Sequence, residues 1–196
     1  MTPRAYVGVG GNLGTDAEIL GRFGAAAREL SSWAEVRSVR RSPVYRSAPV
    51  GPVADQAWFL NAVLEVELTG AVEPVPFLDR LLALELVLGR VRDGAVAKGP
   101  RAIDLDLLLV GDVQVHDPGP PPLVLPHPAM TARAFVLVPL RDLAGGDAII
   151  PGAGRLDAVL AVVEQAGDVA LVPVEDHQGD GDAQGHRGVG ATEQKQ

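Results

Sequence analysis

Residues 59–68 read FLNAVLEVEL and give the clearest strand signal in the chain. Side chains alternate between the two faces of a β-strand. The alternation predicts one continuous buried face, made of Leu60, Ala62, Leu64, Val66 and Leu68. Phe59 and Asn61 share the opposite face. We therefore expect this strand to lie in a sheet with an apolar layer against it.

The segment before this strand predicts a strand, a helix and a further strand. Residues 5–10 are rich in β-formers and end at a glycine turn, residues 10–14. Thr15 and Glu18 have the spacing of a capping box, so a helix should begin here. Residues 36–46 predict a strand, and its interleaved arginines indicate an edge or partly solvated position.

The segment after it predicts a second helix and another long strand. Pro74 and Pro76 mark the start of that helix, and Gly89 is expected to cap its end. A strand is predicted over residues 102–110, and a short strand at 113–115 could pair with it as a hairpin. The remaining predicted elements are helices near 130–143 and 156–166 and a strand at 169–172.

The order strand, helix, strand, strand, helix, strand is that of the ferredoxin-like βαββαβ unit. We therefore predict an α+β fold with a ferredoxin-like core, whose antiparallel sheet is extended by extra strands and flanked by helices in three α-β-α layers. Residues 177–196 contain no aromatic residue, one valine and five glycines. This composition predicts a disordered tail.

Composition excludes several classes of function. The chain has 196 residues and a formal net charge of −8, which disfavours binding to nucleic acid or anionic membranes. It has no cysteine, which excludes disulfides, thiolate nucleophiles and Cys-ligated metal sites. No apolar run approaches the ~18 residues that a membrane helix requires. We expect a soluble, cytoplasmic protein.

Residues 99–110, GPRAIDLDLLLV, are the most informative for chemistry. Asp104 and Asp106 are two positions apart on the predicted strand, so their carboxylates share one face. Two such carboxylates repel each other unless a cation intervenes, and Mg²⁺ usually combines one or two protein carboxylates with phosphate oxygens. The alternative interpretation is a solvated strand face with two surface acids.

A cluster of basic residues precedes these aspartates. Arginine binds phosphoryl oxygens in a bidentate manner and neutralises charge in phosphoryl transfer. The alternative is that the cluster only pairs with nearby acids such as Glu85, Asp93 or the two aspartates. The cluster consists of Arg90, Arg92, Lys98 and Arg101.

Other residues could bind a flat ring or a phosphate. Phe59 and Asn61 combine an apolar surface with an amide edge, which suits a planar heterocycle. They are also compatible with a core phenylalanine beside a buried, satisfied asparagine. Arg133 and Phe135 could contact phosphate and ring, or be surface and core, and His127 could be a ligand or structure its loop.

The common nucleotide motifs are absent. The chain has no GxxxxGK[S/T] loop, and its glycines at 8, 10 and 14 miss the GxGxxG spacing by one residue. A Rossmann fold is therefore disfavoured, and these glycines are expected to form a tight turn.

Together, these segments resemble the 6-hydroxymethyl-7,8-dihydropterin pyrophosphokinase family. Members of that family transfer pyrophosphate from ATP to a pterin alcohol in folate biosynthesis and release AMP. The resemblance runs from about residue 4 to about residue 174, and its most specific part is the GPRxxDxD segment. The matching segments, in order, are 9–13, 45–47 with 51–52, 59–61, Glu85 with 89–92, 99–106, and 126–130 with Arg133 and Phe135.

The resemblance implies a role for each matching residue. Mg²⁺, expected as two ions, would be held by Asp104 and Asp106. The pterin would lie between Phe59 and Phe135, with its edge read by Asn61 and the backbone near Ser47, Ala48 and Val50. ATP contacts would come from Glu85, Arg92, Lys98, His127 and Arg133. Catalytic assistance would come from Arg90 and Arg101.

The resemblance also implies the organisation of the chain. Residues 1–175 would form a pyrophosphokinase domain, an ATP-dependent diphosphotransferase, followed by the tail at 176–196. Loops around 46–56 and 91–99 would close over the substrates. We expect a monomer whose partners are ATP and 6-hydroxymethyl-7,8-dihydropterin, without nucleic acid or membrane.

Two departures from the family pattern stand out. Gly11 replaces the usual serine, and Lys98 replaces the tryptophan often found before Gly-Pro-Arg. Two other functions remain possible from the residues: a non-catalytic ferredoxin-like binding module, and another Asp-x-Asp metal enzyme acting on a nucleotide.

Overall fold

The computed structural model describes residues 2–49, 56–91, 99–166 and 171–174. In this part of the chain the main sheet has six strands, and every neighbouring pair is antiparallel. The order is β10-β3-β4-β1-β5, and β2 also pairs with β4. The strands are β1 (Arg4–Gly11), β2 (Val36–Arg41), β3 (Val44–Ser47), β4 (Phe59–Leu68), β5 (Asp104–Val110) and β10 (Leu171–Val174).

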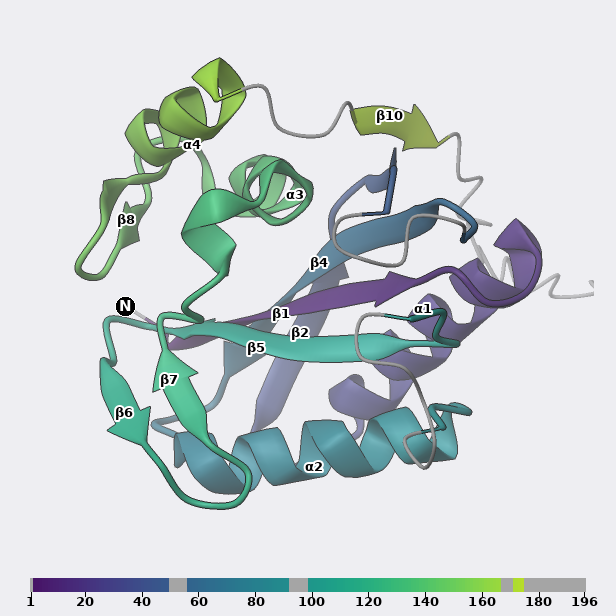
Figure 1. Cartoon of the computed structure of the whole chain (residues 1–196). Helices are drawn as coiled ribbons and strands as arrows, with labels where there is room; N and C mark the ends of the chain where they lie inside the picture. The colour runs from purple at the N-terminus through teal and green to yellow at the C-terminus, as the bar shows by residue number, and fades with distance from the viewer. Residues whose placement is uncertain (1, 50–55, 92–98, 167–170, 175–196) are drawn as a thin grey trace, which may run out of the picture.

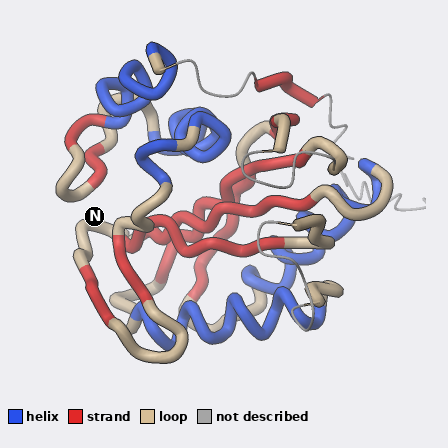
Figure 2. The backbone as a smooth tube through the Cα atoms, in the orientation of Figure 1, coloured by secondary structure: helices blue, strands red, loops and turns tan. Residues whose placement is uncertain are grey.

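Helices cover both faces of this sheet (Figures 1 and 2). On one face lie α1 (Asp16–Ser31) and α2 (Pro74–Val87), and on the other lie α3 (Ala134–Ala144) and α4 (Leu156–Gln165). The predicted α+β fold in three layers is confirmed, and its ferredoxin-like core is β1-α1-β2-β4-α2-β5, with β3 as an extra strand between β2 and β4. No described helix is long and apolar enough to cross a membrane.

Strand β4 lies between the two apolar layers. Its predicted face packs into the core formed with α1 and α2, and Leu60, Leu64 and Leu68 are fully buried there. Its other face is also covered, since Val63 packs with Leu137 of α3 in the second core. Full burial of a Leu or Val side chain contributes about 1.5–3 kcal/mol, so this strand is a principal source of stability.

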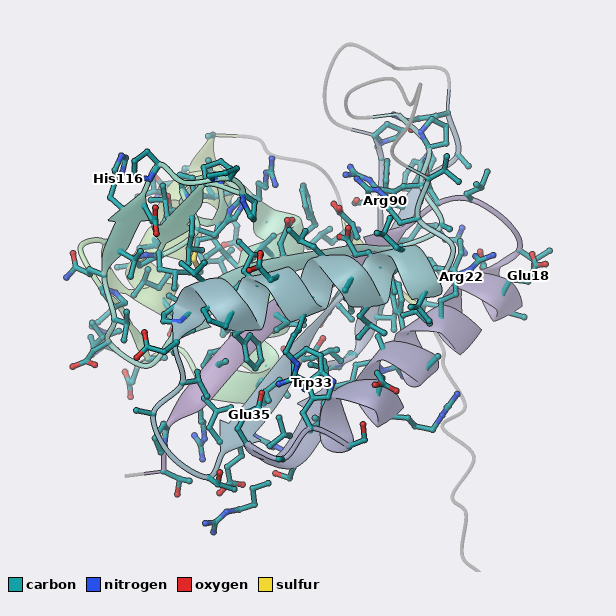
Figure 3. All side chains as sticks on the ribbon, turned by 90° about the horizontal axis from the view of Figure 1, so that it is seen from below. Glu18, Arg22, Trp33, Glu35, Arg90 and His116 are labelled. Carbon is teal, nitrogen blue, oxygen red and sulfur yellow. The ribbon has the colours of Figure 1, made fainter. Side chains whose placement is uncertain are left out.

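Helix α1 begins where the capping box predicts. The Thr15 hydroxyl accepts a hydrogen bond from the Glu18 backbone N–H, and the Glu18 carboxylate accepts one from the Thr15 backbone N–H. After α1 comes Trp33, which is labelled in Figure 3. It packs edge to face on Phe77 of α2, and the ring centroids are 5.2 Å apart. The Arg80 guanidinium lies 3.7 Å from the Trp33 ring centroid, which closes the layer of α1 and α2 at this end.

The prediction of a single strand over residues 36–46 was wrong, because this segment forms two strands, β2 and β3. The chain breaks at Ser42 and Pro43, since proline has no N–H to donate to a ladder. Ser42 fills the gap: its backbone N–H donates to Val63 O, and its hydroxyl accepts from Val63 N–H. After this interruption β3 pairs with Phe59–Asn61 of β4, whereas β2 pairs with Leu64–Leu68.

The predicted hairpin between 102–110 and 113–115 was also wrong. The short strand is β6 (Val115–Asp117), and it pairs with β7 (Leu123–Leu125) rather than with β5. Gly111 follows β5 with φ of +52°, a conformation that favours glycine, and Val113 N–H donates back to Val110 O. This turn leads the chain off the sheet.

The helix predicted near residues 130–143 is also in two parts. A short 3₁₀ helix, η1 (Met130–Ala132), precedes α3, and Arg133 between them is extended, with φ of −134°. The last strand, predicted at 169–172, is β10 at Leu171–Val174. The predicted tail at 176–196 lies outside the described residues. A small hairpin, β8 (Ile149–Ile150) with β9 (Gly154–Arg155), joins α3 to α4.

Candidate active site

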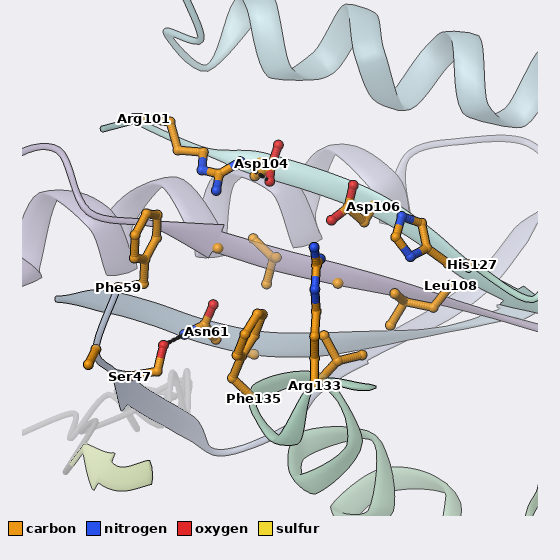
Figure 4. Close-up of a pocket in the computed structure, with 16 residues that line it drawn as sticks. Ser47, Phe59, Asn61, Arg101, Asp104, Asp106, Leu108, His127, Arg133 and Phe135 are labelled. Atoms are coloured by element: carbon orange, nitrogen blue, oxygen red, sulfur yellow. Dashed lines mark hydrogen bonds and ion pairs between the residues drawn. The ribbon is translucent and has the colours of Figure 1, made fainter. Parts of the chain in front are cut away.

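A cleft of about 310 Å³ opens on the sheet face that α3 and α4 partly cover. Its floor is formed by β1, β3, β4 and β5, and its wall by His127 and the start of α3 (Figure 4). Because these segments are far apart in the chain, only the fold brings them together. A cleft of this size is typical of small-molecule sites.

Asp104 and Asp106 line this cleft from β5, as their spacing predicts. Leu105 between them is buried in the opposite core. Both oxygens of Asp104 are bound by arginines: Arg90 Nη1 lies 2.7 Å from Oδ1, and Arg101 Nη1 lies 2.7 Å from Oδ2. The sequence left open whether the basic cluster pairs with nearby acids. Arg90 and Arg101 do so, because both pair with Asp104.

Asp106 has a different environment. Burial, followed by the nearby charge of Asp104, raises the pKa of its carboxyl group above the ordinary value. No ion pair with arginine reaches this carboxylate among the described residues. The ionised form of Asp106 is therefore destabilised, and a bound cation would stabilise it.

His127 lines the cleft beside Asp106 (Figure 4). Its Nδ1 accepts a hydrogen bond from the Ala129 backbone N–H at 3.3 Å. Burial lowers the pKa of His127, although the charge of Asp106 opposes this shift. A neutral ring that accepts at Nδ1 carries its proton at Nε2, so His127 can donate a hydrogen bond in the cleft.

Arg133 extends from the start of α3 toward the two carboxylates (Figure 4). Its guanidinium also lies 5.6 Å from the Phe135 ring centroid, and that of Arg101 lies 5.1 Å from the Phe59 ring centroid. Each aromatic ring of the cleft therefore has an arginine against it. These two arginines therefore lie between the aromatic part of the cleft and its carboxylates.

Asn61 lies on the cleft face between the two phenylalanines (Figure 4). Its Nδ2 donates to Ser47 Oγ at 2.9 Å, and both residues are buried. This bond orients the amide, so that its oxygen remains as an acceptor. The interpretation of Asn61 as a satisfied buried residue and its interpretation as a ring contact are thus compatible.

Glu85 does not line the cleft. It is buried in α2, and its Oε1 accepts a hydrogen bond from the Leu105 backbone N–H at 2.6 Å. The N–H of Leu105 belongs to the strand that carries both aspartates. Glu85 therefore supports β5 from the α2 side, whereas its predicted contact with ATP stays a prediction.

Some residues of the site were not predicted from the sequence. Leu108 lines the cleft, and period-two alternation from Asp106 could have found it. Gly8 and Val136 also line it. Buried Asn12 was missed as a support: its Oδ1 accepts from Arg101 N–H at 2.9 Å, and its Nδ2 donates to Ala57 O at 2.9 Å.

Gly11 has a local explanation. A Cβ at this position would lie 2.7 Å from the backbone oxygen of Ala102, so a larger residue would require a backbone shift. Of the remaining predicted site residues, Ala48 lines the cleft. Val50, Arg92 and Lys98 lie outside the described residues, as do most residues of both predicted closing loops.

The donor set fits magnesium. Within the described ranges, no three or more His, Cys, Asp or Glu side chains are grouped as a metal site made of protein ligands alone. Two carboxylates on one strand face, beside cationic side chains suited to phosphate, match a metal that completes its shell with substrate oxygens and water.

Comparison with known proteins identifies the family. The family model of 7,8-dihydro-6-hydroxymethylpterin-pyrophosphokinase matches residues 6–145. The chain belongs to this family. It is 44% identical over 161 residues to a protein of Pseudomonas aeruginosa, covering 82% of this chain and 92% of that one. It is 41% identical over 161 residues to one of Methylorubrum extorquens, covering 79% and 94%.

Both relatives are named 2-amino-4-hydroxy-6-hydroxymethyldihydropteridine pyrophosphokinase. The resemblance expected from the sequence is confirmed, and with it the prediction of a pyrophosphokinase, a diphosphotransferase enzyme of folate biosynthesis.

The family fold also matches a solved structure. Plasmodium falciparum HPPK-DHPS, crystallised with pteroate, has a TM-score of 0.63 at 12% identity over 86% of this chain. This chain spans 46% of that longer one.

Proposed function

We propose that this pyrophosphokinase transfers the terminal diphosphate of ATP to the hydroxymethyl group of 6-hydroxymethyl-7,8-dihydropterin, and that the reaction requires Mg²⁺. The observation that carries the proposal is the single cleft with two chemically different ends. One end is aromatic with an amide, and the other combines paired carboxylates with arginines. A ring alcohol and a polyphosphate can therefore meet in one cavity.

The aromatic end suits the pterin. Phe59 and Phe135 offer two ring faces, and Asn61 lies between them with its amide held by Ser47. A fused planar ring gains apolar burial from the phenylalanines and hydrogen bonds from the amide. Backbone groups near Ala48 and Val50 are proposed to read the rest of its edge.

The other end suits the phosphates of ATP. Asp104 and Asp106 would hold two Mg²⁺ ions, and bound metal would neutralise the phosphate charge and order the chain of phosphates. Arg133 and the Nε2–H of His127 would bind phosphate oxygens, which their positions beside the carboxylates support. Arg92 and Lys98 are proposed as further ATP contacts.

In the proposed reaction the hydroxymethyl oxygen of the pterin attacks the β-phosphorus of ATP. A P–O bond forms there as the bond from the β-phosphorus to the bridging oxygen of AMP breaks. AMP leaves with the electron pair, and the hydroxyl proton goes to water. Arg90 and Arg101 neutralise the charge that develops, so no Ser or Cys nucleophile is needed.

The test is the identity of the nucleotide product. The protein is incubated with ATP, MgCl₂ and 6-hydroxymethyl-7,8-dihydropterin, and nucleotides are separated by chromatography. We expect AMP in equal amount to the pterin diphosphate. ADP instead would indicate ordinary phosphoryl transfer, and pterin binding without turnover would indicate a binding module.

Two variants connect this activity to the carboxylates. Asp106→Asn should lower kcat at least about a hundredfold, because metal ligation supplies several kcal/mol of charge stabilisation. Asp112→Asn is the matched control, since Asp112 is exposed in the turn after β5 and lies outside the cleft lining. Equal activity of both variants would contradict the role of Asp106.

A further inference from the structure

A hydrogen bond joins the sheet to the helix that carries Phe135. Tyr45 Oη of β3 donates to Asp142 Oδ2 of α3 at 2.7 Å. Phe135 lies in the first turn of the same helix, two turns before Asp142. The bond thus ties one wall of the cleft to the strand that forms part of its floor.

Tyr45 lies next to the residues proposed to bind the pterin edge. It shares a strand face with Ser47, whereas Val44 before it is buried in the opposite core. Tyr45 is also the register partner of Asn61, and Ser47 is that of Phe59. A shift between β3 and α3 would therefore move Phe135 relative to Asn61.

The remaining described contacts of α3 with the sheet are mainly apolar. Leu137 and Leu140 pack in one core with Val63 of β4. Apolar burial is non-directional, so it tolerates small sliding of a helix, whereas a hydrogen bond requires a defined distance and angle. Burial, then the bond to Asp142, raises the pKa of Tyr45 to about 12, so the phenol stays a donor at neutral pH.

We propose that Tyr45 is a positioning residue for the pterin, because its hydrogen bond to Asp142 sets where α3 places Phe135 relative to Asn61. The inference rests on the proposed function, which supplies the pterin as the ligand of this end of the cleft. Asp104 and Asp106 lie on the edge strand β5, and β4 and β1 separate β5 from β3 in the sheet. Arg133 also lies at the start of α3, but it is one of several proposed ATP contacts, whereas Phe135 is one of two proposed ring contacts. The effect should therefore fall on the pterin more than on ATP.

The test is steady-state kinetics of Tyr45→Phe with each substrate varied in turn. We expect KM for the pterin alcohol to rise roughly three- to tenfold, the range for one lost hydrogen bond. We expect kcat and KM for ATP to stay within about twofold. Asp142→Ala should have the same effect, and the double variant should be no worse than either single one. Asp142→Asn keeps an acceptor oxygen and should restore most of the wild-type KM.

Tyr6→Phe is the matched control. Tyr6 Oη also donates to a carboxylate, Glu65 Oε2 at 3.1 Å, but that bond lies within the sheet and outside the cleft lining. Its KM for the pterin should match the wild type. The positioning role would be overturned if Tyr45→Phe left the pterin KM unchanged. It would also be overturned if both KM values rose and kcat fell by the same factor. A wild type that forms no AMP would instead overturn the proposed function.

Discussion

Asp104 and Asp106 lie on the same face of β5, yet among the described residues only Asp104 is ion-paired with arginine: Arg90 binds one of its oxygens and Arg101 the other, each at 2.7 Å. Burial and the charge of Asp104 raise the pKa of Asp106. In the absence of metal, the first carboxylate is therefore neutralised by its two ion pairs. The second has no ion pair within the described part of the chain, although the charges of Arg133 and Arg101 favour its ionised form.

This asymmetry predicts opposite effects of the same substitution on stability. Without metal, Asp106→Asn should raise Tm at pH 7, by about 2–4 °C for each kcal/mol of relieved repulsion. Asp104→Asn should lower Tm, because it leaves two partly buried guanidinium groups without their carboxylate. Differential scanning calorimetry in EDTA measures both. Shifts of the same sign would show that the arginines do not discriminate between the two aspartates.

The raised pKa of Asp106 also predicts a pH dependence. A group whose pKa is higher in the folded state stabilises the fold fully below its unfolded pKa, about 3.9 for Asp. That contribution is lost as pH rises through the folded-state pKa. The Tm advantage of Asp106→Asn over the wild type should therefore be absent near pH 3 and grow toward pH 7. A constant difference across this range would assign the effect to packing instead of charge.

Arg101 is predicted to act on turnover more than on binding. Arg101→Lys keeps the positive charge but loses the planar fork that reaches Asp104 and the contact with the Phe59 ring. We expect kcat to fall about a hundredfold while the Kd for ATP, measured by calorimetry, changes less than about threefold. An equal loss in kcat and ATP affinity would indicate a simple binding residue.

Glu85 is predicted to stabilise β5. Glu85→Ala leaves the buried N–H of Leu105 without its acceptor, which costs about 1–3 kcal/mol of unfolding free energy. Glu85→Gln retains an acceptor oxygen and is the control. Urea denaturation should rank the wild type and Gln variant above the Ala variant. Equal stability of the Ala and Gln variants would show that this hydrogen bond does not support the strand.

Local patterns were good predictors where a single periodicity was satisfied. The alternation of residues 59–68 and the capping box of Thr15 and Glu18 were both confirmed. The strand at 36–46 failed because Pro43 interrupts its ladder, and Ser42 bonds to Val63, a residue distant in sequence. Pro43 was a local signal of this break, whereas the bonding of Ser42 to Val63 depends on a partner strand that local propensity does not specify.

The amino-acid sequence alone determines which side chains share a strand face. Two-residue spacing is enough to bring Asp104 to the side of Asp106, and Phe59 to the side of Asn61, because the backbone geometry of a strand requires it. Only the tertiary structure decides which partners those side chains meet. Arg90 and Arg101 both bind Asp104, and Arg133 points toward the carboxylates from a separate layer. Contacts between layers depend on how the apolar faces of helices and sheet pack, and no local spacing encodes that arrangement.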